Sequence, residues 1–366
     1  MLNLDTEAGI ESAQDSSSEA GIMTNSDEKR NVYNGLHGAF NPNKRVKIGD
    51  SQNVANRWFD KTIQIHTSRD GSFGLNFEHS PMDGPAIIAL VNSVLESTSS
   101  DHDHNIRMTD DNKVPSNCMI PLKFTTPQHL QQELEKTFDM TNNLIGSMQG
   151  TYGKFVPFGK QEIKSLGVSP DAFIQVGMQL AYNRLHPDLM PPPTYESGSL
   201  RRFMNGRTEC IRSCSPQSVE FTQIMRHSSD HLAQKGALIE ACAAHSKYTK
   251  LAMSAKAFDR HFLGLKAIAI ESGLVKEELV KNFLLNPHFA RLSDFRISSS
   301  QISSKWDISV LFGPTSPDGY GFCYNIQDKQ IVICSSSFRK SADTRAPVNF
   351  LQAFGSSLKD MRRLFE

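Results

Sequence analysis

Residues 307–335 read DISVLFGPTSPDGYGFCYNIQDKQIVICS, three apolar runs separated by short polar segments. The runs are Asp307–Phe312, Gly321–Ile326 and Gln330–Ser335, and the turn residues between them are Pro317-Asp318-Gly319 and Gln327-Asp328. Runs of β-branched and aromatic residues bounded by such turns are typical of strands that pair antiparallel. This stretch therefore predicts three adjoining antiparallel strands.

Helical patterns flank these strands. Ser169-Pro170-Asp171 supplies a capping hydroxyl, a proline for the first helical position and an acid for the first turn. The helix that follows has its expected core positions at Phe173, Val176, Leu180 and Ala181. Two helices are expected between His231 and Gly273, with core positions at Leu251, Phe258, Phe262, Leu263 and Leu265. A last amphipathic helix is expected to bury Phe350, Leu351, Phe354, Leu358, Met361 and Leu364. The fold class is therefore α/β in the broad, α+β sense.

Toward the N-terminus the composition changes. Residues 1–54 are rich in Ser, Asp, Asn and Gly, so we expect disorder there. Alternation in Thr62–His66 and Phe73–Phe77, with Asp70-Gly71 between, predicts a β-hairpin. A buried helix from Pro85 to Leu95 and a polar connection from Glu96 to Pro115 follow, and a domain boundary is placed near residue 122.

Composition limits the function classes. Lys plus Arg and Asp plus Glu are equal at 39 each, which disfavours a nucleic-acid or anionic-membrane partner. No apolar run reaches the roughly 20 residues that a membrane helix needs. The six cysteines include no CxxC pair, so we expect free thiols and no metal site.

One short motif places a histidine and a carboxylate four residues apart. His79-Ser80-Pro81-Met82-Asp83-Gly84 has the pattern HxxxDG. A histidine that is neutral near pH 7 can act as a general base. On its own the motif is weak, because a histidine beside an acid is more often an ordinary loop residue.

Two further groups have both a functional and an ordinary interpretation. Lys160 and Lys164, with Lys154, form a local basic site that suits phosphates, although two such lysines more often lie on a solvated helix face. Ser298-Ser299-Ser300-Gln301 places hydroxyls where a chain bend can aim them at a developing oxyanion, although serine clusters are more often polar loops.

A series of motifs then occurs in a characteristic order and spacing. They are Asn56-Arg57-Trp58-Phe59-Asp60-Lys61, Glu78-His79, Ser169-Pro170-Asp171-Ala172-Phe173-Ile174-Gln175, Pro193-Thr194-Tyr195-Glu196-Ser197, Gly206-Arg207-Thr208-Glu209, Asp259-Arg260-His261 and Pro317-Asp318-Gly319-Tyr320-Gly321. From about Asn56 to the C-terminus the chain resembles the carnitine/choline acyltransferase family, and most of all its carnitine acetyltransferases.

The resemblance implies reversible transfer of an acetyl or short acyl group between coenzyme A and the 3-hydroxyl of carnitine. It implies His79 as the general base and Ser300 as the oxyanion donor. Asp83 and Arg207 match positions that support the histidine, with Arg207 as the ion-pair partner of Asp83. Transfer is expected to be direct, without an acyl-enzyme.

The resemblance also implies two substrate sites. The carnitine site comprises Tyr195, Thr208, Arg260, Ser298 and Phe312, with Arg260 favouring carnitine over choline, which has no carboxylate. The coenzyme A site comprises Lys160, Lys164 and Asp171. Val310 matches the position that closes the acyl pocket in acetyl-specific members. Coenzyme A is thus a co-substrate, no cofactor is bound permanently, and His79, Ser300 and Arg260 should meet in one tunnel.

The family fold implied is a pair of chloramphenicol-acetyltransferase-like domains. The expected division is a remnant of the first domain at 55–121, carrying His79, and a complete second domain at 122–366. Two interpretations follow: a catalytically competent acyltransferase, or a truncated, inactive fragment or regulatory isoform that binds coenzyme A or carnitine. A monomer in the mitochondrion or peroxisome is implied by resemblance alone, because the chain shows no targeting signal at either end.

Overall fold

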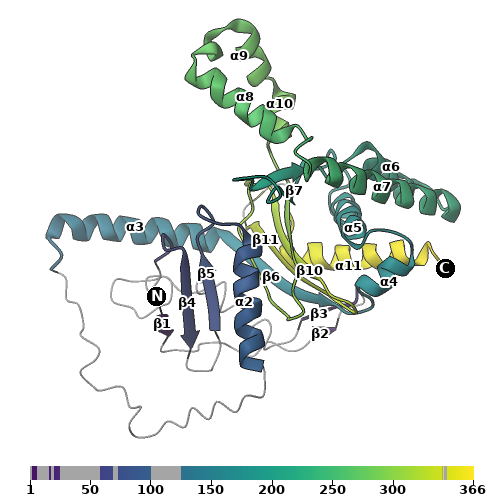
Figure 1. The fold of residues 1–366 in the computed structure, drawn as a ribbon, viewed down its shortest axis with the longest axis horizontal. Coiled ribbons are helices and arrows are strands. Elements are labelled where there is room, and N and C mark those ends of the chain that lie inside the picture. Colours follow the sequence, from purple (N-terminus) through teal and green to yellow (C-terminus); the bar gives the residue numbers. More distant parts are fainter. Residues whose placement is uncertain are drawn as a thin grey trace, which may run out of the picture.

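The structure is a computed structural model that describes residues 2–5, 16–17, 20–24, 58–68, 73–99, 125–339, 341 and 344–366. Its strands are β1 (Leu2–Asp5), β2 (Ser16–Ser17), β3 (Ile22–Thr24), β4 (Ile63–Ser68), β5 (Phe73–Phe77), β6 (Met148–Phe155), β7 (Thr194–Ser199), β8 (Thr208–Ile211), β9 (Ile297–Ile302), β10 (Tyr320–Ile326) and β11 (Ile331–Phe338). Among the described residues, a large sheet has the order β2-β3-β6-β11-β10-β9-β7-β8 and a small one the order β1-β4-β5. Helices and strands are mixed, as predicted (Figure 1).

The helices cover the large sheet unequally. They are α2 (Gly84–Ser99), α3 (Gln128–Ser147), α4 (Lys160–Ser165), α5 (Pro170–Leu185), α6 (Pro216–His227), α7 (His231–Ala252), α8 (Asp259–Glu271), the 3-10 turn η2 (Leu274–Lys276), α9 (Glu278–Leu284), α10 (Pro287–Leu292) and α11 (Pro347–Arg363). In Figure 1, α5 and α11 lie against one face of the sheet, α2 lies on the other side, and α8 to α10 project away. None of the described helices is both long and apolar enough to cross a membrane.

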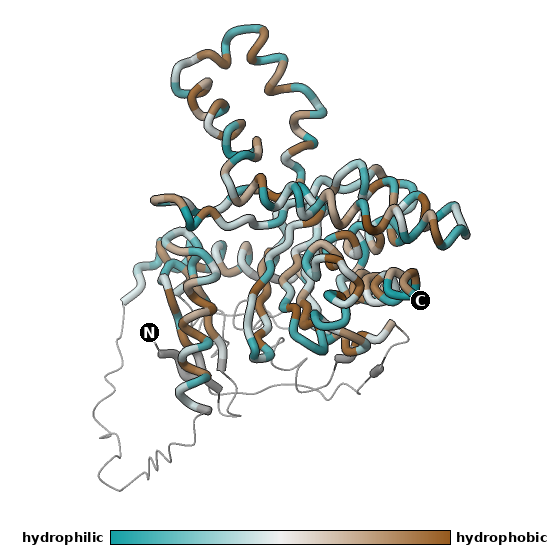
Figure 2. The backbone as a smooth tube through the Cα atoms, turned by 45° about the vertical axis from the view of Figure 1, so that its right-hand side comes forward, coloured by the Kyte–Doolittle hydropathy of each residue, from teal (hydrophilic) through white to brown (hydrophobic). Residues whose placement is uncertain are grey.

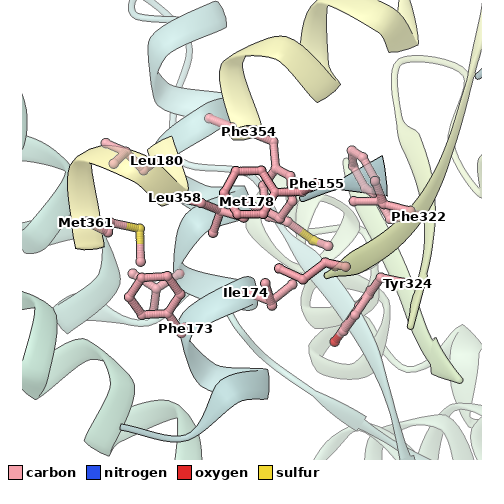
Figure 3. Packing of buried hydrophobic residues seen from close by; sticks show 14 of the residues in the cluster. Phe155, Phe173, Ile174, Met178, Leu180, Phe322, Tyr324, Phe354, Leu358 and Met361 are labelled. Carbon is pink, nitrogen blue, oxygen red and sulfur yellow. The ribbon is translucent and has the colours of Figure 1, made fainter. Parts of the chain in front are cut away.

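The main core lies between the large sheet and the pair α5 and α11. Ring and aliphatic side chains from β6, β10, α5 and α11 interlock there, as Figure 3 shows for Phe155, Phe173, Met178, Phe322, Phe354 and Leu358. Every core position predicted for α5 and for the last helix is buried. Burial of this many large apolar side chains is the main force that holds α5 against the strands.

Local signals placed several elements correctly. The Ser169 hydroxyl accepts a hydrogen bond from the Ala172 backbone N–H, with Pro170 in the first turn, so α5 begins where the capping pattern predicts. The expected pairs β10–β11 and β4–β5 are both antiparallel, and the turn at Asp70-Gly71 lies outside the described residues. β9, by contrast, runs parallel to both of its neighbours, β7 and β10.

The prediction of a strand at Asp307–Phe312 was wrong. Both neighbours of β10 are already present as β9 and β11, so β10 offers this segment no free edge to pair with. It crosses as irregular chain instead, and Val310 and Phe312 pack against a small cluster of Ile88, Ile302 and Cys323. The serines that we expected at a bend lie inside β9.

Several expected core positions of α7 and α8 are exposed. The exposed fractions of Leu251, Leu263 and Leu265 are 39%, 56% and 48%, while Phe258 and Phe262 are half-buried. The pattern of apolar residues was read correctly as helical, but α8 stands in the projecting part of the molecule, where Figure 2 shows hydrophobic residues along an isolated tube. The predicted helix at Pro85–Leu95 is present as α2, but the expectation that it is buried was only partly right: Ile87 and Ile88 are buried, whereas Leu90 and Val94 are 43% and 52% exposed.

Part of the segment expected to be disordered is ordered. β3 pairs with β6, and Ala20 and Ile22 join the main core, because Ile22 packs on the side of Gly355 in α11. β1 and β2 also fall within 1–54, and the rest of that segment lies outside the described residues, as does most of the connection from Glu96 to Pro115. The divisions 55–121 and 122–366 remain a prediction.

Two side chains of α11 provide a test of this packing. Phe354 is fully buried between the sheet and α5, whereas Val348 on the same helix is 45% exposed. Phe354→Ala should lower the free energy of unfolding by about 3–5 kcal/mol, because it removes a buried ring and leaves a cavity. Val348→Ala should change it by no more than about 0.5 kcal/mol. Urea unfolding of the two variants measures the difference, and equal losses would contradict this description of the core.

Candidate active site

A single large cavity collects most of the predicted site residues. Its volume is about 2330 Å³. The predicted residues that line it are His79, Asp83, Asp171, Tyr195, Arg207, Thr208, Arg260, Ser298, Ser300, Val310 and Phe312. They come from the loop after β5, from β7, β8 and β9, from the start of α5 and α8, and from the irregular segment after β9. The structure therefore brings His79, Ser300 and Arg260 to one place although more than two hundred residues of sequence separate the first from the second.

Arg207 organises the loop that carries His79. Its guanidinium donates to the backbone oxygens of His79 at 2.7 Å and Ser80 at 2.8 Å, and to Asp83 Oδ1 at 2.9 and 3.1 Å. Asp83, by hydrogen bonding and charge, raises the pKa of Arg207 further. The predicted Asp83–Arg207 ion pair is present, and it fixes the turn between β5 and α2.

His79 itself remains accessible. Its side chain is 61% exposed, and its Nδ1 lies 3.9 Å from Asp83 Oδ1 and 3.3 Å from Arg207 Nη2. Nδ1 thus faces the Asp83–Arg207 pair, which leaves Nε2 as the ring nitrogen for a substrate. Proton abstraction by Nε2 requires the tautomer that carries its proton on Nδ1.

Two of the three residues expected at one anion site are in contact, and the third, Tyr195, lines the same cavity. Arg260 Nε donates to the Thr208 carbonyl at 2.8 Å, and Arg260 Nη2 donates to Thr208 Oγ1 at 3.1 Å. Tyr195 stands opposite Ser298 in the β7–β9 pairing and packs edge-on against Phe295, with ring centroids 5.4 Å apart. A guanidinium beside a hydroxyl is an arrangement that suits a carboxylate.

The three consecutive serines of β9, Ser298 to Ser300, point alternately to the two faces of the sheet. Ser298 and Ser300 share one side of β9, while Ser299 turns toward α5, where its hydroxyl accepts from Gln175 Nε2 at 3.0 Å and donates to the Tyr195 carbonyl at 3.2 Å. Ser300 is half-buried at the cavity wall. The middle serine therefore anchors the strand, and its two neighbours are presented together.

A buried polar network lies beneath this wall. The Tyr324 hydroxyl donates to Asp171 Oδ1 at 2.6 Å and accepts from Gln175 at 2.8 Å, and His245 Nε2 lies 2.7 Å from Glu196 Oε2. Burial, together with the charge of Glu196, raises the pKa of Asp171 to about 7. Burial opposes charge on His245, yet the facing carboxylates raise the pKa of His245 overall.

Asp171, Glu196 and His245 are also spaced as metal ligands can be, with their ligating atoms within 4.8 Å of one another. The direct contact between His245 and Glu196 and the 2.8 Å hydrogen bond from Ser213 to Glu196 are those of a hydrogen-bonded network. Sequence reasoning missed Glu196, although it stands within the quoted Pro193–Ser197 motif, and His245, for which the helical pattern contains no signal.

The predicted phosphate-binding lysines do not line this cavity. Lys160 and Lys164 lie on α4, and Lys160 Nζ is 3.2 Å from Asp328 Oδ1. Lys154 pairs with Asp307 at 2.7 Å. Two of the three lysines therefore have carboxylate partners, and Lys164 is exposed on α4.

Comparison with known proteins gives a consistent result. Residues 2–359 match the family described as Choline/Carnitine o-acyltransferase, so the match begins well before Asn56. The chain is 37% identical to Carnitine O-acetyltransferase of Columba livia over 319 residues, which cover 87% of this chain and 49% of that protein. Identity to the Homo sapiens protein of the same name is 38% over the same coverage.

Choline O-acetyltransferase of Rattus norvegicus is 37% identical over 324 residues, 86% of this chain and 48% of that protein. The chain thus spans about half the length of the curated relatives that it matches. Among solved structures, a chloramphenicol acetyltransferase overlaps with a TM-score of 0.32 at 12% identity, over 59% of this chain and 88% of that chain. This overlap is too slight to add to the family match.

The network predicts an unusual pH dependence of stability. Between about pH 4 and pH 7 the native chain keeps a proton on Asp171 that the unfolded chain has lost, so stability falls as the pH rises through this range. Asp171→Asn does not titrate, so its free energy of unfolding should rise relative to wild type from pH 4.5 to about 7. Urea unfolding across this range measures the difference, with Asp188→Asn at an exposed site as the control. Parallel curves for wild type and Asp171→Asn would contradict the prediction.

Proposed function

Because the chain belongs to the choline/carnitine O-acyltransferase family, we propose that it transfers an acetyl or short acyl group between coenzyme A and the 3-hydroxyl of carnitine. The observation that carries the proposal is the meeting of His79, Ser300 and the Thr208–Arg260 pair in one cavity. These groups supply a base, an oxyanion donor and a carboxylate site, which are the three requirements of this reaction.

The proposed reaction is one direct transfer. His79 Nε2 takes the proton from the 3-hydroxyl of carnitine as that oxygen attacks the thioester carbon. The Ser300 hydroxyl donates to the carbonyl oxygen as negative charge develops there. The bond from carbon to sulfur breaks, and the proton held by His79 passes to the departing thiolate. The reverse reaction uses the same groups in the opposite order.

Binding of carnitine is assigned to both ends of that molecule. Arg260, Thr208 and Tyr195 bind its carboxylate; the Arg260 guanidinium and the Thr208 hydroxyl already lie 3.1 Å apart. Ser298 belongs to the same site, and the ring of Phe312 faces the trimethylammonium group. Choline has no carboxylate, so these residues favour carnitine as the acceptor.

Coenzyme A is proposed as the second substrate and not as a resident cofactor. Lys160 and Lys164 would bind its phosphates, in which case coenzyme A competes with Asp328 for Lys160. Asp171 contributes from the cavity wall, where it is half-buried and accepts a hydrogen bond from Tyr324. A monomer in the mitochondrion or peroxisome is the setting proposed from the family.

The second candidate function is binding without turnover, as an inactive fragment or regulatory isoform. It is favoured by the length of the chain, about half that of its curated relatives, and by the 61% exposure of the His79 side chain. A base so open to water makes a less protected site than a closed tunnel does.

The first test is carnitine-dependent release of thiol from acetyl-CoA by the purified chain. His79→Ala should lower kcat by about 100-fold or more, because proton transfer is lost. Ser300→Ala should lower kcat by roughly 100- to 1000-fold through loss of the oxyanion donor. His129→Ala, at an exposed site on α3, is the matched control. Turnover that survives His79→Ala would refute the catalytic assignment, and a folded chain that binds coenzyme A without turnover would establish the second function.

The acyl preference is assigned to Val310, which packs beside Ile88, Ile302 and Cys323. Val310→Gly should raise the ratio of kcat/KM for octanoyl-CoA over acetyl-CoA by about tenfold or more, and Val310→Met should lower it, because a pocket discriminates by roughly 1–3 kcal/mol per methylene. Rates with a series of acyl-CoA lengths give both ratios. Unchanged ratios in both variants would remove Val310 from the acyl pocket.

A further inference from the structure

The segment from Phe258 to Leu292, here called the lobe, comprises α8, η2, α9 and α10 and projects from the body of the protein (Figure 1). Within it Ala269 has the one buried side chain among those helices, and Phe262, Phe283 and Phe289 form its own small aromatic cluster. Such a segment has little apolar contact to hold its orientation. Its position therefore depends on the two points where the chain enters and leaves.

One side chain joins both of these points. Arg212, the residue after β8, donates through Nε to Asp259 Oδ2 at 3.1 Å and through Nη2 to Asp259 Oδ1. Its Nη1 donates to the Leu292 carbonyl at 2.6 Å. Asp259 is the first residue of α8 and Leu292 is the last residue of α10. A single guanidinium therefore binds the entry and the exit of the lobe.

The surroundings make this contact stronger than a surface ion pair. The side chains of Arg212 and Asp259 are each only 12% exposed. The guanidinium carbon lies 4.9 Å from the ring centroid of Phe295 and 5.7 Å from that of Phe258. Partial burial, a two-pronged contact and flanking rings are conditions in which arginine differs from lysine.

Arg260 follows Asp259 in the sequence, and residues of β8 also contact Arg260. The Arg260 backbone N–H points to the buried carboxylate of Glu209, at 3.3 and 3.4 Å from its two oxygens, and the Arg260 side chain reaches Thr208. β8 and the residue after it thus contact the first turn of α8 at three places. Removing the contact at Arg212 would allow this turn to rotate with the lobe.

We propose that Arg212 is a positioning residue for substrate binding: it clamps the lobe to β8 and so aims the Arg260 guanidinium into the cavity. This role rests on the proposed function: carnitine, the acceptor that bears a carboxylate, is the substrate whose binding depends on the Arg212 contact. Binding of coenzyme A should depend on this contact less, because its two proposed lysines lie on α4, which does not line the cavity, whereas Arg260 does.

The kinetic test compares Arg212→Met, Arg212→Lys and Arg184→Met. Arg184 pairs with Asp360 at 2.7 Å between α5 and α11, so it is an arginine–aspartate pair remote from the lobe. Arg212→Met should raise KM for carnitine about tenfold and leave KM for acetyl-CoA within about twofold. Arg212→Lys should lie between it and wild type, and Arg184→Met should match wild type. Equal rises in both KM values, or none, would overturn the proposal.

A double substitution separates positioning from general damage. Arg212 acts through Arg260, so Arg212→Met should have no further effect on kcat/KM for carnitine when Arg260 is already Met. An effect of the same size in both backgrounds would show that Arg212 does not work through Arg260, and would overturn the proposal.

Hydrogen exchange tests the clamp without reference to turnover. Amides of residues 259–292 should exchange about tenfold faster in Arg212→Met than in wild type, while amides of α5 keep their rates. Unchanged exchange in the lobe would overturn the clamp whatever the activity. If the wild-type chain neither binds nor turns over carnitine while exchange does accelerate, the clamp stands and it is the proposed function that fails.

Discussion

The position of β9 between β7 and β10 is the constraint on which the rest of the site depends. Parallel pairing on both sides places Ser298 opposite Tyr195 and also opposite Gly321. Because side chains alternate along a strand, this register presents Ser298 and Ser300 to the cavity and turns Ser299 toward α5. A slip of one residue would exchange these faces, so register, more than any single contact, determines which hydroxyls reach the cavity.

The register is held from below by polar contacts as well as by packing. Gln175 of α5 links Ser299 to Tyr324, and Tyr324 in turn binds Asp171 at the start of the same helix. These groups lie against the aromatic core of α5 and α11, where hydrogen bonds between buried polar atoms are strong, and the oxygen of this amide, Gln175 Oε1, is left without a partner among the described residues. The helix therefore does two things: it buries the apolar face of the sheet, and its Gln175 side chain bonds the middle serine of β9.

Sequence patterns predicted where helices and strands lie better than they predicted what those elements pack against. Capping and periodicity placed α5, α11 and the hairpins, since these signals depend on neighbours in sequence. The strand predicted at Asp307–Phe312 and the core positions Leu263 and Leu265 were wrong, because an apolar run does not show whether a sheet edge is free or whether a helix faces the core. Arg212, Glu196 and His245 could not be found from the sequence, because each has its partner 47 or 49 residues away.

The candidate site residues were predicted from motifs in a characteristic order and not from local physical patterns, and their roles remain predictions. The structure brings most of them to one cavity, while Lys160 and Lys164 stand apart on α4. Thr208 and Arg260 are the core of the proposed carboxylate site, in a chain that spans about half the length of its curated relatives. Calorimetric titration with L-carnitine tests it most directly. The account predicts saturable binding that Arg260→Met weakens about tenfold while weak binding of choline is unaffected; no saturable binding of L-carnitine, or equal binding by both proteins, would contradict it.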